Sequence, residues 1–209
     1  MTTTPTSRRQ MYAAATRTAL LDAGRESFAE RGYAGTSIED ITAAALISKG
    51  AFYRHFADKQ AIFLDLFAER LHDAAESIEE AVTGIQQAEP GAGPPIAIAC
   101  AYAFAARSIS DPVHRELLRQ APEVLGEQKY NAIDDKLVLP PVQRLLAVLA
   151  ERGELRDGVP LETTARLLLR LMCASNTIIA NAADRESMLA ECATTMMFIF
   201  AGVLKTAET

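Results

Sequence analysis

The chain has 209 residues, 49% of them hydrophobic, and a formal net charge of −6 at pH 7. It is long enough to bury a core, and it shows neither a bilayer-length apolar run nor the apolar segment of a signal peptide. We therefore expect a cytoplasmic protein with no membrane partner, and the alanine- and leucine-rich composition without sustained apolar–polar alternation predicts an all-α fold.

The first elements are a flexible arm and two helices. Residues 1–11 are polar and rich in threonine, which is typical of a flexible arm, and the next helix spans residues 12–30 and ends at Gly32. Thr36 is predicted to cap a short second helix, because Glu39 follows three residues later and completes a capping-box pattern.

Two further caps predict the third and fourth helices. Ser48 precedes a short helix that ends near Phe56, and Asp58 precedes a longer helix whose apolar positions continue to Val82. Two short helices joined by a tight turn form a helix-turn-helix, whose second helix lies in the DNA major groove. We therefore expect a three-helix DNA-binding domain over residues 12–57.

The rest of the chain predicts five more helices, so about nine are expected in all. Residues 86–95 are rich in breakers and are the clearest linker. Pro140 and Pro141 should break the helical stretch 127–152 just after Leu139. The five predicted helices span residues 96–108, 112–126, 127–152, 161–182 and 184–205.

Charge is divided unevenly along the chain. Residues 1–60 hold eight Lys and Arg against six Asp and Glu, whereas residues 61–209 hold thirteen against twenty-one. A basic head on a larger acidic body is compatible with DNA binding. An ordinary acidic protein with a chance fluctuation in charge remains an alternative, so the charge permits DNA binding without establishing it.

The predicted third helix carries side chains suited to DNA. Small residues let the backbone approach a groove, basic residues can contact phosphates or guanine, and the tyrosine and histidine can bond to phosphates. Each residue taken alone could equally be a surface or core residue. The predicted DNA contacts are Thr36, Ser37, Ser48, Lys49, Gly50, Ala51, Tyr53, Arg54, His55 and Lys59.

This stretch, TSIEDITAAALISKGAFYRHFADKQAIF, resembles the DNA-binding head of the TetR (tetracycline-repressor) family of bacterial transcription regulators. The resemblance covers about residues 12–65, and SKGAFYRHF followed by Lys59 is its most specific part. It implies a homodimer that binds double-stranded DNA at a pseudopalindromic operator and is released by a small-molecule effector. No catalytic residue, metal or cofactor is expected.

Leu46 departs from the family pattern. It stands in the turn where the family usually carries glycine. A leucine with positive φ is costly. We therefore expect the turn to take another conformation or the second helix to extend.

The resemblance also implies that residues 58–209 sense the effector and dimerise. The last two helices are apolar around their circumference, which favours an interface with a second chain over burial in a single core. Met188, Met196, Met197, Phe198 and Phe200 are the expected contacts. A pocket between the fourth and eighth helices should be mainly apolar. Its candidate lining residues are Phe63, Phe67, Tyr102, Phe104, Arg107, His114, Tyr130, Arg144, Met172 and Asn176.

Two other classes of protein were weighed against a regulator. An enzyme is disfavoured, because the three histidines are scattered and no nucleophile elbow, P-loop or dinucleotide motif occurs. A helical ligand-binding or scaffolding protein without specific DNA binding is the better alternative. The three cysteines are widely spaced in apolar surroundings, which indicates buried free thiols.

Overall fold

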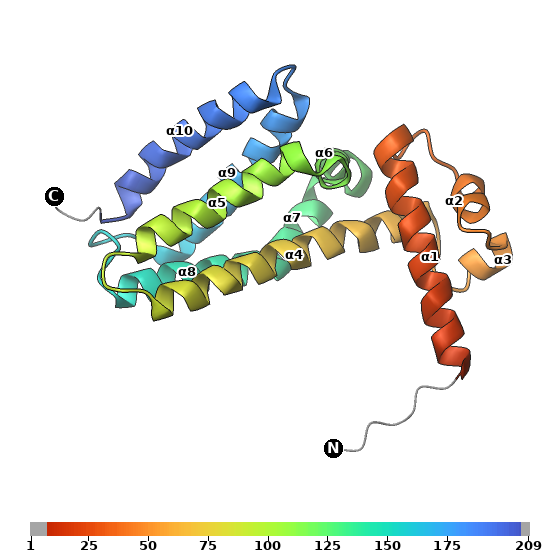
Figure 1. Cartoon of the computed structure of the whole chain (residues 1–209), viewed down its shortest axis with the longest axis horizontal. Helices are drawn as coiled ribbons and strands as arrows, with labels where there is room; N and C mark the ends of the chain where they lie inside the picture. The colour runs from red at the N-terminus through yellow and green to blue at the C-terminus, as the bar shows by residue number, and fades with distance from the viewer. Residues whose placement is uncertain (1–7, 206–209) are drawn as a thin grey trace. The chain divides into compact units, whose positions relative to one another are not determined.

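The structure is a computed structural model that describes residues 8–205, and this range contains ten helices and no strand, which confirms the all-α prediction (Figure 1). The chain divides into two compact units, the first ending at Phe67 and the second beginning at Ala68. The helices are α1 (Arg8–Arg31), α2 (Ile38–Ala44), α3 (Lys49–Phe52), α4 (Lys59–Gln87), α5 (Gly93–Ser110), α6 (Pro112–Leu125), α7 (Glu127–Leu137), α8 (Leu139–Glu151), α9 (Leu161–Asn181) and α10 (Arg185–Val203).

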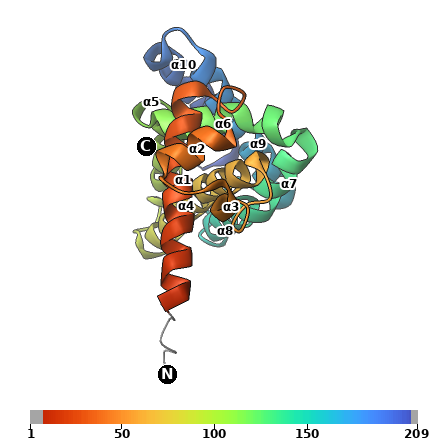
Figure 2. The same ribbon diagram turned by 90° about the vertical axis from the view of Figure 1, so that its right-hand side faces the viewer.

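The first unit is built on the packing of α1 against the start of α4. A Cβ added to Gly24 would lie 3.0 Å from a methyl group of Ile62, so the glycine permits a close approach of the two helices. The ring of Phe63 meets those of Phe28 and Tyr33 edge-on, with centroids 5.5 and 5.3 Å apart. Helices α2 and α3 lie beside α1, as the view onto this unit shows (Figure 2).

Three caps form as the sequence predicts. The side chain of Ser48 accepts a hydrogen bond from the backbone N–H of Ala51, and that of Asp58 accepts one from Ala61. Asp111 accepts two, from the first turn of α6. These caps fix where α3, α4 and α6 begin.

The cap of α2 differs from the prediction. The side chain of Ser37, not that of Thr36, accepts a hydrogen bond from the backbone N–H of Asp40, and the carboxylate of Asp40 accepts one from the N–H of Ser37, so the capping box lies one residue further on. Thr36 is buried, and its hydroxyl lies within 3.0 Å of the carbonyl oxygens of Ser27 and Gly32. Thr36 therefore attaches the loop to α1.

Two helix boundaries also differ from expectation. Helix α1 begins at Arg8, so residues 8–11 of the predicted arm are helical, while the rest of that arm lies outside the described residues. The proline break falls at Val138, one residue earlier than predicted, because Pro140 and Pro141 fit the first turn of α8. The stretch therefore forms two helices, which brings the number to ten.

Helix α9 is the centre of the second unit, because it packs on α5, α6, α8 and α10. The buried carboxylate of Glu154 joins the loops at one end of this unit. It accepts hydrogen bonds from the N–H of Gly91 and the guanidinium of Arg152 at 2.8 and 3.1 Å, and its backbone carbonyl accepts one from the N–H of Lys205. These bonds hold the α4–α5 loop and the end of α10 together.

Candidate DNA interface and effector cavity

The residues expected to contact DNA form an exposed face around α3. Phe52 is fully buried and turns α3 so that the opposite side faces outward. Ala51 and His55 are half-buried at the edge of this face. Its exposed members are Ser37, Ser48, Lys49, Gly50, Tyr53 and Arg54.

Gly50 is the most open position on this face. A Cβ built on it would meet no other atom within 4 Å, and the structure gives it no positive φ. Folding therefore does not require a glycine there. A glycine is required there only where the backbone must come close to a binding partner.

Lys49 forms an exposed ion pair with Glu39 on α2. The carboxylate holds the pKa of Lys49 above its usual value, and the ammonium holds the pKa of Glu39 below its own. Exposed pairs of this kind are weak and screened by salt. A phosphate could therefore take the place of Glu39.

Lys59 faces inward rather than away from the head. Its ammonium donates hydrogen bonds to the backbone carbonyls of Tyr33 and Thr36 at 2.6 and 2.7 Å, and it lies 4.1 Å from the centroid of the Tyr33 ring. Partial burial lowers the pKa of Lys59. In this arrangement Lys59 holds the α1–α2 loop against the start of α4.

Leu46 adopts the conformation that the sequence argued against. Its φ is +55°, and it is the one non-glycine residue with positive φ among residues 8–205. Helix α2 ends normally with Ala45 as its cap, so the turn keeps the left-handed position in spite of the leucine. Because 93% of the Leu46 surface is exposed, the leucine side chain itself gains little packing to offset the strain.

We expect Leu46→Gly to raise the free energy of unfolding by about 0.5–1 kcal/mol, because relief of left-handed strain outweighs the added flexibility of the unfolded chain. Urea denaturation followed by circular dichroism measures it. Ala45→Gly is the control, since Ala45 is right-handed and its replacement should destabilise the head. A destabilising Leu46→Gly would contradict the strain.

The second unit contains an apolar cavity of about 480 Å³ between α4, α5, α8, α9 and α10. This volume lies in the range of small-molecule sites. Three of the predicted lining residues border it, namely Phe104, Arg107 and Met172. Ordinary apolar helix positions carry no sequence signal for a cavity, so most of the wall could not be predicted. The unpredicted lining residues include Cys100, Val142, Leu145, Leu149, Leu168 and Val203.

The other predicted lining residues lie elsewhere. Phe63 packs in the core of the head and Phe67 is also fully buried, so neither borders the cavity. Arg144 pairs with Glu79 on the surface. Tyr102 is half exposed and borders a groove outside the cavity.

A second, much smaller cavity, of about 10 Å³, lies beside the first, and Tyr130 and Asn176 border it together with Phe104 and Asp134. His114 is fully buried next to it, with its ring edge-on to that of Phe104 at 6.0 Å. Burial lowers the pKa of His114 to about 4, so this imidazole is neutral at pH 7. Five of the ten predicted lining residues therefore border these two cavities, namely Phe104, Arg107, Tyr130, Met172 and Asn176.

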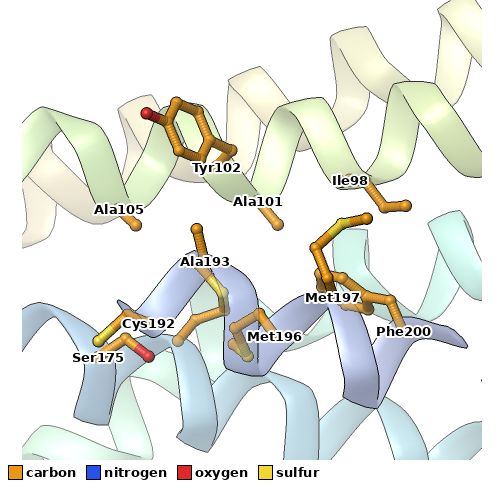
Figure 3. Close-up of a pocket in the computed structure, with 11 residues that line it drawn as sticks. Ile98, Ala101, Tyr102, Ala105, Ser175, Cys192, Ala193, Met196, Met197 and Phe200 are labelled. Carbon is orange, nitrogen blue, oxygen red and sulfur yellow. The ribbon is translucent and has the colours of Figure 1, made fainter. Parts of the chain in front are cut away.

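Helices α9 and α10 expose apolar side chains, chiefly Leu167, Leu171, Ile178, Met197 and Phe198. A shallow groove of about 60 Å³ runs between α5 and α10, where Ala101 and Ala105 point toward Ala193 (Figure 3). Among residues 8–205, α10 alone has the length and composition of a membrane span, which differs from the expectation that the chain has no such segment. One such helix is weak evidence for a membrane.

A helix-turn-helix head followed by a helical body with an internal cavity is the architecture of a ligand-responsive DNA-binding regulator. A sequence profile for bacterial regulatory proteins of the tetR family matches residues 20–66, and one for tetracyclin repressor-like C-terminal domains matches residues 96–203. The chain belongs to the TetR family of transcriptional regulators.

Individual relatives agree with this assignment. The HTH-type transcriptional repressor AcnR of Corynebacterium efficiens is 28% identical over 176 residues, 81% of this chain and 84% of AcnR. The repressor DhaR of a Mycobacterium species is 38% identical over 66 residues, which span only 33% of DhaR. A TetR-family regulator from Pectobacterium atrosepticum has a crystal structure that covers 97% of this chain and 100% of its own, with a TM-score of 0.76 and 25% identity.

Proposed function

We propose that the protein is a cytoplasmic homodimeric repressor that binds a palindromic operator and releases it when a small molecule enters the cavity. The observation that carries this proposal is the separation of two features along the chain. An exposed face on α3 is suited to DNA, and a cavity of about 480 Å³ lies in the other unit. A ligand-released regulator needs both, whereas a ligand-binding or scaffolding protein has no need of the DNA-binding face.

The proposed DNA contacts are the exposed residues of this face. Ser37, Ser48, Tyr53 and His55 supply hydrogen-bonding groups for phosphates, and Arg54 supplies a charge. The side chains of Thr36 and Lys59 are used inside the head and leave this set. Lys49 joins this set of DNA contacts when its ammonium leaves Glu39 and pairs with a phosphate.

We expect Gly50→Ala to weaken operator binding by roughly tenfold without lowering thermal stability, because the added methyl meets only open space in the free protein and alanine favours a helix. Fluorescence anisotropy with operator DNA and a thermal melt measure the two quantities. Ala43→Gly, at an exposed position of α2, controls for a change in helix stability. Unchanged operator affinity in Gly50→Ala would show that the backbone does not approach DNA.

The exposed apolar residues of α9 and α10 support the proposed dimer. Of the five expected contacts, Met197 and Phe198 are 50% and 76% exposed and are available to a partner. Met196 is buried within its own chain, and Phe200 borders both the large cavity and the groove. The proposed interface therefore rests on Met197, Phe198 and the exposed positions of α9.

Selection from a library of genomic fragments tests the repressor proposal. Purified protein should enrich a short inverted repeat, and binding should weaken steeply as salt rises, because several phosphates are contacted. Enrichment of no specific sequence would sink the proposal and favour the ligand-binding scaffold. Sedimentation of Phe198→Glu, beside the wild type, tests the dimer, since a charge in an apolar interface should give monomers.

A further inference from the structure

The small cavity beside the effector cavity carries two unpaired polar atoms. Asp134 and Asn176 are 1% and 3% exposed, and both border this cavity. Within residues 8–205, Asp134 Oδ1 and Asn176 Nδ2 have no hydrogen-bond partner. Buried polar atoms are nearly always paired, so an unpaired acceptor and an unpaired donor at one cavity indicate a missing partner.

The rest of both side chains is held firmly. Asp134 Oδ2 lies 3.2 Å from the thiol sulfur of Cys173 and 3.2 Å from the guanidinium of Arg170. Asn176 Oδ1 accepts a hydrogen bond from the hydroxyl of Ser108 at 3.1 Å. The unpaired atoms are therefore presented by side chains whose orientation is already fixed, as a binding site requires.

The small cavity adjoins the large one. Phe104, Val138 and Leu169 border both, so one layer of side chains divides them. Phe104 is only half-buried, and a ligand that reaches both spaces requires this shared layer to move. The ring of His114, whose two nitrogens also lack a partner within the described chain, packs edge-on against Phe104.

The two unpaired atoms specify a chemistry. A hydroxyl group donates one hydrogen bond and accepts others, so it can satisfy Asp134 Oδ1 and Asn176 Nδ2 together. An ether offers no donor, and a carboxylate would meet the carboxylate of Asp134. A hydroxyl is therefore the smallest organic group that fits both atoms.

We propose that the effector is an apolar molecule that carries a hydroxyl group, with its body in the large cavity and its hydroxyl between Asp134 and Asn176. This inference rests on the proposed function, since it names the chemistry of the same effector site. The competing occupant is an apolar acid. Arg107 borders the large cavity and makes no hydrogen bond or ion pair within residues 8–205, so its charge could pair with an anion.

Calorimetric titration of the full chain without DNA separates these occupants. The probes are n-octanol, n-octyl methyl ether and octanoate, which share one apolar chain. Wild type should bind n-octanol about tenfold more tightly than the ether, which corresponds to one well-formed hydrogen bond. Asp134→Asn should abolish that preference, because an amide NH2 in place of Oδ1 no longer accepts the hydrogen bond that only the alcohol can donate. The variant Arg107→Gln should keep the preference.

Three outcomes would overturn the inference. Equal affinities for n-octanol and the ether in wild type would mean that a water molecule occupies the small cavity. Tighter binding of octanoate, lost in Arg107→Gln, would assign an acid, and no binding of any probe would exclude this ligand class. If Asp134→Asn loses the wild-type circular dichroism spectrum, Asp134→Ala replaces it. Operator selection without probes tests the proposed function separately, so the two can fail independently.

Discussion

Replacement of Arg170 by methionine should lower the free energy of unfolding by about 3 kcal/mol at pH 7, because it leaves the buried carboxylate of Asp134 without its cation. Arg170 also pairs with Asp135 and donates to the carbonyl of Asn131 at 3.3 Å. Urea denaturation at a series of pH values measures the loss. It is the largest single effect that the structure predicts for the second unit.

The loss in Arg170→Met should shrink as the pH falls. Burial raises the pKa of Asp134 above its ordinary value of 3.8, and removal of Arg170 should raise it further. A group with a raised folded-state pKa costs stability as the pH rises through that pKa, and protonation removes the cost. The difference from wild type should therefore be smaller at pH 5 than at pH 8.

Arg166→Met is the matched control for this experiment. Arg166 pairs with Asp135 at 2.6 Å, but both side chains are well exposed, so the loss should stay below about 1 kcal/mol. Comparing each variant with wild type at the same pH cancels the titration of His114. The role of Asp134 would be contradicted if both variants lost the same free energy of unfolding. It would also be contradicted if the loss in Arg170→Met did not depend on pH.

Replacement of Lys59 by methionine should destabilise the DNA-binding head by about 2 kcal/mol, because two backbone carbonyls lose a charged donor and the Tyr33 ring loses its cation. Hydrogen exchange of the α1, α2 and α3 amides measures this loss without interference from the second unit. Operator affinity should fall as the head becomes less stable. The dependence of affinity on salt should not change, since no phosphate contact is removed.

Arg54→Met provides the opposite pattern. Arg54 is exposed and its side chain makes no hydrogen bond or ion pair within residues 8–205. Its loss should leave hydrogen exchange unchanged and lower the salt slope of operator binding by about one. If Lys59→Met kept normal hydrogen exchange and lowered the salt slope of operator binding, Lys59 would contact a phosphate, as the resemblance to the family implies.

Local patterns were enough to predict the helices and the family. Ser48, Asp58 and Asp111 accept bonds from residues two or three positions ahead, so their role depends only on nearby sequence. The segment SKGAFYRHF supplies both the exposed face and Phe52, the buried residue that anchors it, as a helix-turn-helix requires. Such short-range features can be predicted from the order of residues, although the Thr36 cap shows an error of one position.

The position of Leu46 shows where a local argument fails. The backbone preference of leucine disfavours a positive φ, so a different turn is expected from the sequence. The chain accepts the strain because Ile47 and Phe52 must reach the positions that join α2 to α3, and the backbone bond from Ile47 to Thr42 closes the turn. The packing of two helices outweighs the cost at one residue.

The amino-acid sequence by itself determined the all-α class, the caps, the helix-turn-helix and the membership of the TetR family. Tertiary structure decided which charges and cavities matter. Lys59 meets carbonyls 23 and 26 residues away, and the large cavity takes its wall from five helices. Hydrogen bonds and voids between distant segments depend on how helices pack, and periodicity within one helix carries no record of the neighbour it will meet.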